Sequence, residues 1–346
     1  MNPHEPVLIQ SRENPLVKQL KRLAHESGAY RKQGRVWVEG EHLCGAALAR
    51  GVQPELVVFA ESAWAAQAPH PSRELQRDAA LFRLSSRAQA QLEPQPSAPK
   101  GRGRSAALAL SVPLLGRERS PVFPPLPLGE GRGEGSPPDA HHEFHKQNWP
   151  LAPVHKSQVA IKTVVIVDAL WREFTALESP EGMGCVLALP EAPALQSDAP
   201  TVVLDRVQDA GNVGSILRSA AAFGFTQIVA LKGTALLWSP KVLRAGMGAH
   251  FALRLVEGLS EAALDGLHVP LLATSSHQGD WLHRAELPWP CGWLLGHEGQ
   301  GVSKALQQRA ARQIRIAQPG GEESLNVAAA AAICLHASGA GQDRTR

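Results

Sequence analysis

The chain has 346 residues, 44% of them hydrophobic, and a formal net charge of only +3. This length is typical of two domains with buried cores, and so small a net charge means that binding partners must be inferred from local charge. The sequence holds no run of about 18 apolar residues that would cross a membrane. Its first residues lack the charged and apolar regions of a secretion signal, so we expect a cytoplasmic protein.

The four cysteines are far apart, at Cys44, Cys185, Cys291 and Cys334. No two of them have the spacing of metal ligands, and nothing indicates a disulfide framework. We therefore expect buried or incidental thiols in a reducing compartment, and no metal site.

The first part of the chain predicts a small α/β domain. Residues 14–25 are apolar at Leu16, Leu20 and Leu23 and basic on the other side, which is typical of an amphipathic helix. A second helix is predicted at residues 42–51, and strands are predicted at residues 35–40, 55–60, 162–168 and 184–189. The simplest interpretation is one domain, residues 1–92 and 159–190, interrupted by an insertion.

Seven basic and two acidic residues lie between Arg12 and Arg35. Such an excess of positive charge attracts phosphate backbones. An ordinary solvated helix face has the same appearance, and the sequence does not separate the two. No aromatic side chains alternate with these charges in a stacking platform, so recognition by base stacking is not indicated here.

Residues 93–158 are rich in Pro, Gly, Arg and Ser and have no period of 2 or 3.6. Such a composition buries too little apolar surface to offset the entropy of the chain, so we expect a disordered insertion. The alternative, a basic RNA-binding tail, is weakened by the acidic residues among its arginines. Residues 191–200 are rich in Pro and Ala and are expected to form a linker.

From Thr201 the predicted strands alternate with helical segments, which defines a second domain at residues 201–346. The strands are nearly continuous apolar runs, at residues 201–205, 226–232, 270–275, 292–296 and 312–317. Alternation of this kind is typical of a parallel sheet that is covered on both faces.

The first of three glycine-containing turns is Asp209–Ser219, after the strand at residues 201–205. Its spacing fails the dinucleotide-binding pattern, because the first glycine is too far from the strand and the third is missing. Asn212 is read either as a helix N-cap or as a site residue. Arg218 falls opposite the apolar face of the helix, where it is either solvated or in contact with a ligand or another chain.

The second turn follows the strand at residues 292–296. Gly296 is followed by Glu298, by two further glycines and by Ser303, a candidate N-cap. The third turn leads through Ser324 and Asn326 into an alanine-rich helix, and Ser324 is again a candidate N-cap. A metal site at His297 and Glu298 is discounted, because adjacent residues rarely bind one ion and no third ligand is evident.

Together, in this order, the three turns resemble the signature motifs of the SpoU (TrmH) family of RNA ribose 2′-O-methyltransferases, in the SPOUT superfamily. The N-x-G-x-x-x-R motif is matched by Asn212, Gly214 and Arg218. The L-G-x-E-x-x-G-x-S and S-L-N-V motifs are matched at residues 295–303 and 324–327. The sequence departs from the motifs at Ala210, where the family usually has Pro, and at residues 316–318, where it usually has Ile-Pro-Met. Both departures affect loop backbones rather than the polar side chains of the motifs.

The resemblance implies a C-terminal parallel-sheet domain with a deep trefoil knot, and a small N-terminal α/β domain that binds the RNA substrate. It implies S-adenosylmethionine as cofactor, held mainly by backbone groups of Gly296, Ile316 and Leu325. It further implies methyl transfer to a ribose 2′-hydroxyl, without a metal, by a site composed of Arg218, Asn212, Glu298, Ser324 and Asn326.

The family's sites form between two copies, so the resemblance also implies a homodimer, with no membrane partner. Ribosomal RNA is favoured over transfer RNA as substrate, because the chain has the extra N-terminal domain. Alternatives are a transfer-RNA ribose methyltransferase, an RNA base methyltransferase of the same superfamily, and a non-catalytic RNA-binding protein. Whether Arg218 acts as a base or orients the hydroxyl, and in which subunit, stays open, as do the modified nucleotide and the role of residues 93–158.

Overall fold

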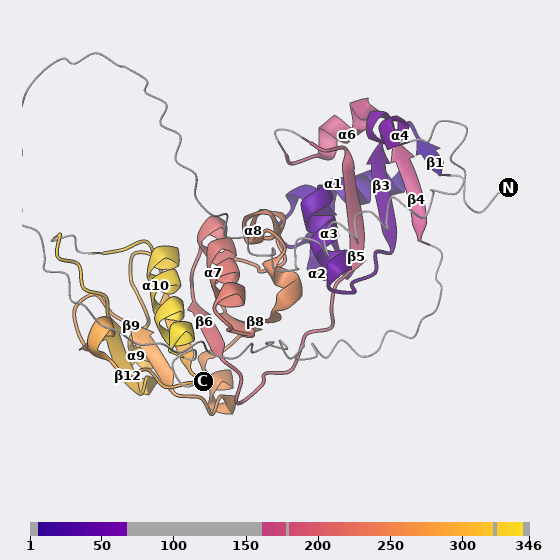
Figure 1. Ribbon diagram of the computed structural model, residues 1–346. Helices are drawn as coiled ribbons and strands as arrows, with labels where there is room; N and C mark the ends of the chain where they lie inside the picture. The colour runs from indigo at the N-terminus through magenta and orange to yellow at the C-terminus, as the bar shows by residue number, and fades with distance from the viewer. Residues whose placement is uncertain (1–5, 68–160, 178–179, 321–323, 342–346) are drawn as a thin grey trace, which may run out of the picture. The chain divides into compact units, whose positions relative to one another are not determined.

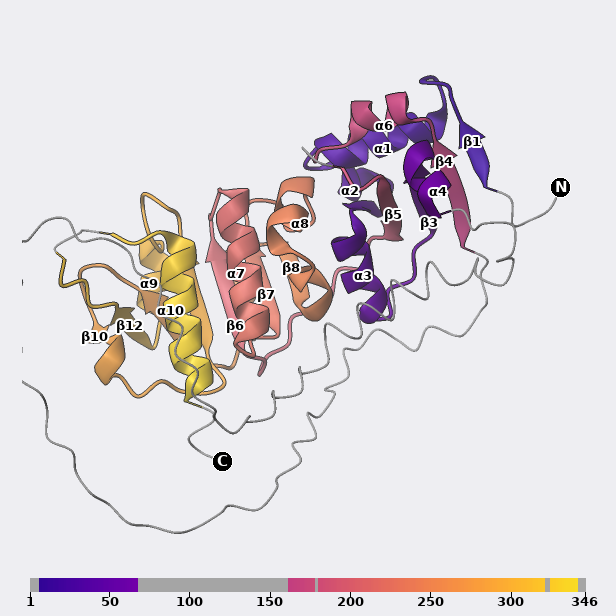
Figure 2. The same ribbon diagram turned by 45° about the horizontal axis from the view of Figure 1, so that its top comes forward.

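The structure, a computed structural model, describes residues 6–67, 161–177, 180–320 and 324–341. They form two β-sheets with their covering helices (Figures 1 and 2). The predicted disordered insertion at residues 93–158 lies outside the described residues. Along the described chain, no helix combines the length and the apolar character that crossing a bilayer takes.

The first sheet has five strands in the order β1-β4-β3-β5-β2. Their bounds are Val7–Ile9 for β1, Arg35–Glu39 for β2, Leu56–Ala60 for β3, Lys162–Ile166 for β4 and Met183–Ala188 for β5. All but the short β1 were predicted. Strands β3 and β4, which lie on either side of residues 68–160, pair in parallel, with Leu56 opposite Lys162.

Among the described residues, five helices accompany this sheet: α1 (Pro15–His25), α2 (Ala29–Gln33), α3 (Glu41–Ala49), α4 (Glu61–Gln67) and α6 (Asp168–Phe174). The predicted amphipathic helix is α1, and Asn14 caps it by accepting a 2.9 Å hydrogen bond from the backbone N–H of Leu16. Leu20 of α1 packs in a core with Trp37, Trp171 and Phe174. Burial of these large apolar side chains, together with edge-on contacts between the rings of Trp37, Trp171 and Phe174, stabilises the sheet and its helices.

The second sheet has seven parallel strands in the order β10-β12-β9-β11-β6-β7-β8. Their bounds are Thr201–Asp205 for β6, Gln227–Leu231 for β7, Arg254–Leu259 for β8, Leu271–Thr274 for β9, Asp280–Trp281 for β10, Gly292–Gly296 for β11 and Arg312–Arg315 for β12. This confirms the predicted parallel sheet. Strands β8 and β10 were not predicted.

Helices α7 (Ala210–Ala222), α8 (Pro240–Gly246), α9 (Lys304–Arg309) and α10 (Val327–Ala340) accompany the second sheet, with short 3-10 turns at Ala249–Ala252, Glu261–Gly266 and Leu282–Arg284. Alternate strand residues face opposite sides: Val202 packs in the cluster that includes α7 and α10, and Val203 packs in the one that includes α9. Both faces are thus buried, as predicted. Helices α7 and α10 lie side by side (Figures 1 and 2).

Gly214, which the sequence analysis placed in a glycine-containing turn, lies inside α7. A Cβ atom at Gly214 would lie 2.3 Å from the Cβ of Ala245 and 2.7 Å from the backbone N of Gly246. The glycine therefore allows α7 and α8 to pack in direct backbone contact. The trefoil knot and the domain limits stay predictions.

Candidate active site

The site begins where two neighbouring strands end. In the parallel pair of β6 and β11, Asp205 lies opposite Gly296, so the loops that follow the two strands leave the sheet side by side. Open α/β sheets bind ligands at this edge, where the carboxyl ends of the strands meet. The first two predicted motifs therefore come together through the register of one strand pair.

Glu298 links these two loops. Its carboxylate accepts hydrogen bonds from the Asn212 side-chain Nδ2 at 3.0 Å and from the backbone N–H groups of Asp209 at 3.1 Å and Gln208 at 3.3 Å. Asn326 then donates from its Nδ2 to the Asn212 side-chain oxygen at 2.9 Å. Asn212 is thus the middle member of a chain of three side chains, one from each predicted motif.

The Glu298 carboxyl is mostly exposed, and its surroundings act on its pKa in two directions. Partial burial raises the pKa, but the hydrogen bonds from Asn212 and the loop backbone favour the charged form and bring the pKa below its ordinary value of 4.5. Glu298 is therefore a carboxylate at neutral pH and acts as an acceptor that holds the loops.

The helix caps differ in part from those predicted. Helix α7 is capped by Asp209, whose side chain accepts from the Asn212 backbone N–H at 2.7 Å, so Asn212 is not the cap. Helix α10 is capped by Asn326 and not by Ser324. Ser303 caps α9, as predicted. Because Asp209 takes the capping role, the Asn212 side chain is left for Glu298 and Asn326.

Gly296 is required by the loop after β11. A Cβ atom there would lie 2.0 Å from the backbone of Gly301 and Val302, closer than any real contact. The loop folds back on itself through two backbone hydrogen bonds between His297 and Gly301, at 3.1 and 2.8 Å. Gly301 has φ +66°, a conformation that favours glycine.

A cavity of about 380 Å³, here called the loop cavity, lies beside this loop. All three residues predicted to bind a cofactor line it, Gly296, Ile316 and Leu325, together with Glu298 and Ser324. Its volume is within the range of small-molecule sites. Gln318 also lines it, and among the described residues the buried Gln318 Oε1 atom has no hydrogen-bond partner. An unpaired buried acceptor of this kind is suited to a donor group of a ligand.

Arg218 is exposed on α7 and does not line the loop cavity. Its guanidinium makes no hydrogen bond or ion pair with any side chain of the described residues. The structure thus brings four of the five predicted catalytic residues to the cavity or its hydrogen-bonded rim, and leaves Arg218 facing outward from the same helix that carries Asn212.

A buried carboxylate that the sequence analysis missed supports the same loops. Asp205 is 2% exposed and accepts from the Ser303 backbone N–H at 2.7 Å and from the Arg206 Nε at 2.9 Å. Arg206, at φ +60°, also donates to the Gln300 side chain at 2.8 Å. The available signal was an Asp-Arg pair directly after an apolar strand, where a buried charge needs a partner.

No three His, Cys, Asp or Glu side chains among the described residues are grouped to hold a metal ion. The expectation that no metal is required stays a prediction.

Comparison with known proteins gives a family match over this part of the chain. The sequence profile of the SpoU rRNA Methylase family matches residues 199–336. The 23S rRNA (guanosine(2553)-2′-O)-methyltransferase RlmP of Bacillus subtilis is 29% identical over 182 residues, 52% of this chain and 73% of the relative. The 23S rRNA (guanosine-2′-O-)-methyltransferase RlmB of Bordetella pertussis is 30% identical over 161 residues, 45% of this chain and 64% of the relative.

Solved structures resemble the whole fold at low sequence identity. The AdoMet-bound rRNA methyltransferase of Sinorhizobium meliloti has a TM-score of 0.63 at 18% identity, covering 96% of each chain. The SpoU methyltransferase AviRb of Streptomyces viridochromogenes has a TM-score of 0.61 at 18% identity, covering 96% of this chain and 100% of its own. At this identity the likeness shows the fold.

Proposed function

We propose that this chain, whose residues 199–336 belong to the SpoU rRNA Methylase family, transfers a methyl group from S-adenosylmethionine to a ribose 2′-hydroxyl of ribosomal RNA. The observation that carries the proposal is the hydrogen-bonded chain of Asn326, Asn212 and Glu298 at the rim of the loop cavity. Three motifs that are far apart in the sequence meet there in one polar arrangement.

The loop cavity fits the proposed methyl donor. Gly296, in the tight loop after β11, contributes backbone to the cavity lining, and Ile316 and Leu325 provide apolar walls. The unpaired Gln318 oxygen offers an acceptor for an amino group of the donor. When bound, S-adenosylmethionine supplies an electrophilic methyl group on a sulfonium.

The chain's contribution to this reaction is mainly positional. Transfer would form a C–O bond as the C–S bond breaks, release S-adenosylhomocysteine and pass the hydroxyl proton to water, so hydroxyl oxygen, methyl carbon and sulfur must be aligned. Asn212, Glu298 and Asn326 fix the rim at which the ribose would be held. We propose that Arg218 orients the ribose hydroxyl and an adjacent phosphate, because a guanidinium does not ordinarily lose its proton.

We further propose that the chain acts as a homodimer in the cytoplasm and that the partner subunit's Arg218 completes each site. Arg218 does not line the loop cavity of its own chain. On α10, Ile333 is 42% exposed, and Leu325, just before the helix, is 40% exposed. Apolar side chains exposed beside a site are suited to a contact between copies.

Methylation of RNA tests the proposal directly. An unmodified ribosomal RNA transcript is incubated with labelled methyl donor, and the product is digested for nucleoside mass spectrometry. We expect 2′-O-methyl nucleosides, and none with Arg218→Ala, although this variant still binds the donor. Base-methylated nucleosides would replace the proposal by a base methyltransferase, and methylation of transfer RNA alone would change the substrate. Absence of donor binding would indicate a non-catalytic RNA-binding protein.

Mixing two inactive variants tests the shared site. An Arg218→Ala subunit keeps its cavity, and a Glu298→Ala subunit keeps its arginine. If the arginine acts across the dimer, mixed dimers regain one working site and activity returns. Activity that stays absent in mixed dimers of demonstrated composition would assign Arg218 to its own chain's cavity.

A further inference from the structure

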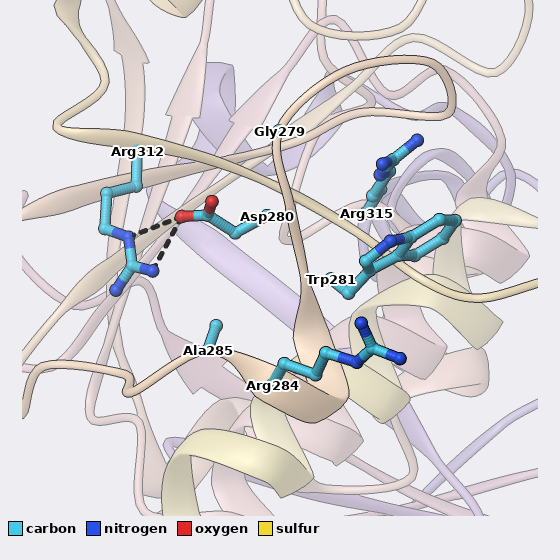
Figure 3. Close-up of a pocket in the computed structure, with 7 residues that line it drawn as sticks. All are labelled: Gly279, Asp280, Trp281, Arg284, Ala285, Arg312 and Arg315. Carbon is cyan, nitrogen blue, oxygen red and sulfur yellow. Dashed lines mark hydrogen bonds and ion pairs between the residues drawn. The ribbon is translucent and has the colours of Figure 1, made fainter.

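A second cavity, of about 340 Å³, lies at the β10 edge of the seven-stranded sheet (Figure 3). Its lining includes Asp280 and Trp281 of β10, Arg312 and Arg315 of β12, and Arg284 of the turn that follows β10. We call it the arginine pocket. It is separate from the loop cavity, and no role for it follows from the three sequence motifs.

The three arginines are not equivalent. Arg312 is committed to the fold: its Nε and Nη2 donate to Asp280 at 2.9 and 2.6 Å, and its Nη1 donates to the Glu286 carbonyl at 2.6 Å. Neither Arg284 nor Arg315 has a carboxylate partner among the described residues, and in Figure 3 both lie beside Trp281. The pocket therefore carries an excess of two positive charges.

Arg315 is held in place without being neutralised. Its guanidinium carbon lies 3.6 Å from the centroid of the Trp281 ring, a stacking contact that fixes the plane of the guanidinium. Its Nε atom is buried and has no hydrogen-bond partner among the described residues. A buried donor without an acceptor is rare in folded proteins and points to an acceptor supplied from outside.

The arginine pocket lies next to the loop cavity along the chain, and this position indicates which molecule supplies the acceptor. Strand β12 and its continuation supply both cavities: Arg312 and Arg315 line the arginine pocket, and Ile314 and Ile316 line the loop cavity. The segment that leads into β10 also lines both cavities. Residues 275–278 line the loop cavity, and residues 279–281 line the arginine pocket. A strand of RNA whose ribose reaches the loop cavity would have neighbouring phosphates within reach of this edge.

We propose that the arginine pocket binds a phosphodiester group of the RNA substrate, close to the ribose presented at the loop cavity. This inference rests on the proposed function, in which the substrate is RNA. Arg284 and Arg315 supply the donors, because the planar guanidinium fork matches the oxygens of a phosphate. Arg312 and Asp280 hold the pocket open as an ion pair.

Binding to RNA at several salt concentrations tests the proposal. The probe is an unmodified ribosomal RNA transcript, and the variants are Arg284→Ala, Arg315→Lys and the control Lys304→Ala, an exposed cation on α9. We expect Arg284→Ala to bind about tenfold more weakly and to lower the salt slope by about one phosphate contact. Arg315→Lys keeps its charge but loses the fork, so we expect weaker binding with little change of slope.

The outcomes separate this inference from the proposed function. Wild-type affinity and slope in both pocket variants would overturn the pocket's role and leave the proposed function intact. An equal loss of RNA affinity in Lys304→Ala would also overturn the pocket's role, because removal of any exposed positive charge would then have the same effect. A changed oligomeric mass with unchanged RNA affinity would assign the pocket to a contact between copies.

A wild-type protein that binds no RNA would overturn both proposals. Binding of S-adenosylhomocysteine, measured by calorimetry, is expected to be unchanged in all variants.

Discussion

Asn326 and Asn212 are 114 residues apart in the sequence and are joined by a 2.9 Å hydrogen bond between their side chains. Asn326 caps its own helix with its oxygen and reaches Asn212 with its nitrogen, so one side chain fixes both the start of α10 and the position of α7. Asn212 in turn donates a hydrogen bond to Glu298, so the position of Glu298 depends on the same contact.

Asn212→Ala is therefore expected to lower the methylation rate by about 10- to 100-fold, because two hydrogen bonds of the rim are lost, one of them to a carboxylate. The fold should persist, since Asp209 and not Asn212 caps α7. Single-turnover methylation measures the effect, and Ser215→Ala, an exposed substitution on the same helix, is the control. A rate equal to that of the control would remove Asn212 from the site.

Gly296→Ala is expected to abolish binding of the methyl donor or weaken it by more than about tenfold, because its Cβ atom has no space against the backbone of Gly301 and Val302. Gly299→Ala is the matched control, since the nearest atoms to its Cβ position are in the His297 ring, 3.8 Å away. Calorimetry with S-adenosylhomocysteine measures both. Similar affinities in the two variants would contradict the close approach described for this loop.

Gly214→Ala is expected to destabilise the fold by about 1–3 kcal/mol, since the added methyl group forces α7 away from α8. Gly320→Ala serves as the control, because among the described residues no atom beyond its chain neighbours lies within 4 Å of its Cβ position. Urea unfolding followed by circular dichroism gives both free energies. Equal stabilities would show that the two helices do not meet as closely as the structure has them.

His250 predicts an acid-dependent loss of stability. Burial lowers the pKa of its ring to about 4, although a hydrogen bond to the Leu237 carbonyl opposes the shift. Between about pH 6.5 and pH 4 the unfolded chain binds a proton that the folded chain does not, so the free energy of unfolding falls as the pH is lowered through this range. The shift corresponds to about 3 kcal/mol.

Urea titrations at a series of pH values measure the free energy of unfolding of the wild type and of two histidine variants. His250→Gln is expected to lose this part of the pH dependence, and the control, exposed His42→Gln, is expected to keep it. The same slope in wild type and His250→Gln would show that the buried ring does not cause the loss.

Much of the second sheet could be predicted because its strands are apolar runs buried on both faces. The strands that were missed lack this signal: β10 has two residues, and Glu257 and Gly258 interrupt the apolar pattern of β8. Strand β1 is three residues long, and Val7 and Leu8 are exposed. Such strands form because a neighbouring strand supplies hydrogen-bond partners, and a single sequence does not carry that information.

The site could be predicted in its residues but not in its connections. The motif spacing indicated Asn212, Glu298 and Asn326, and the capping rules left Asn212 as a candidate cap of α7, although Asp209 has that role. Capping preferences do not distinguish neighbouring Asp and Asn residues. Only the fold shows which of the two side chains is hydrogen-bonded to other parts of the chain. The arginine pocket was missed because its residues come from β12, from β10, which was not predicted, and from the turn that follows β10.

The position of β11 in the sheet also affects how the chain is made. Strands β6, β7 and β8 are neighbours in sequence and in space, whereas β9 joins them only through β11, which pairs with both β6 and β9. During synthesis the first three strands can assemble at once, but the backbone groups along one edge of the apolar strand β6 stay unpaired until Gly296 has left the ribosome. This edge is where a nascent chain would be most prone to self-association and to recognition by chaperones.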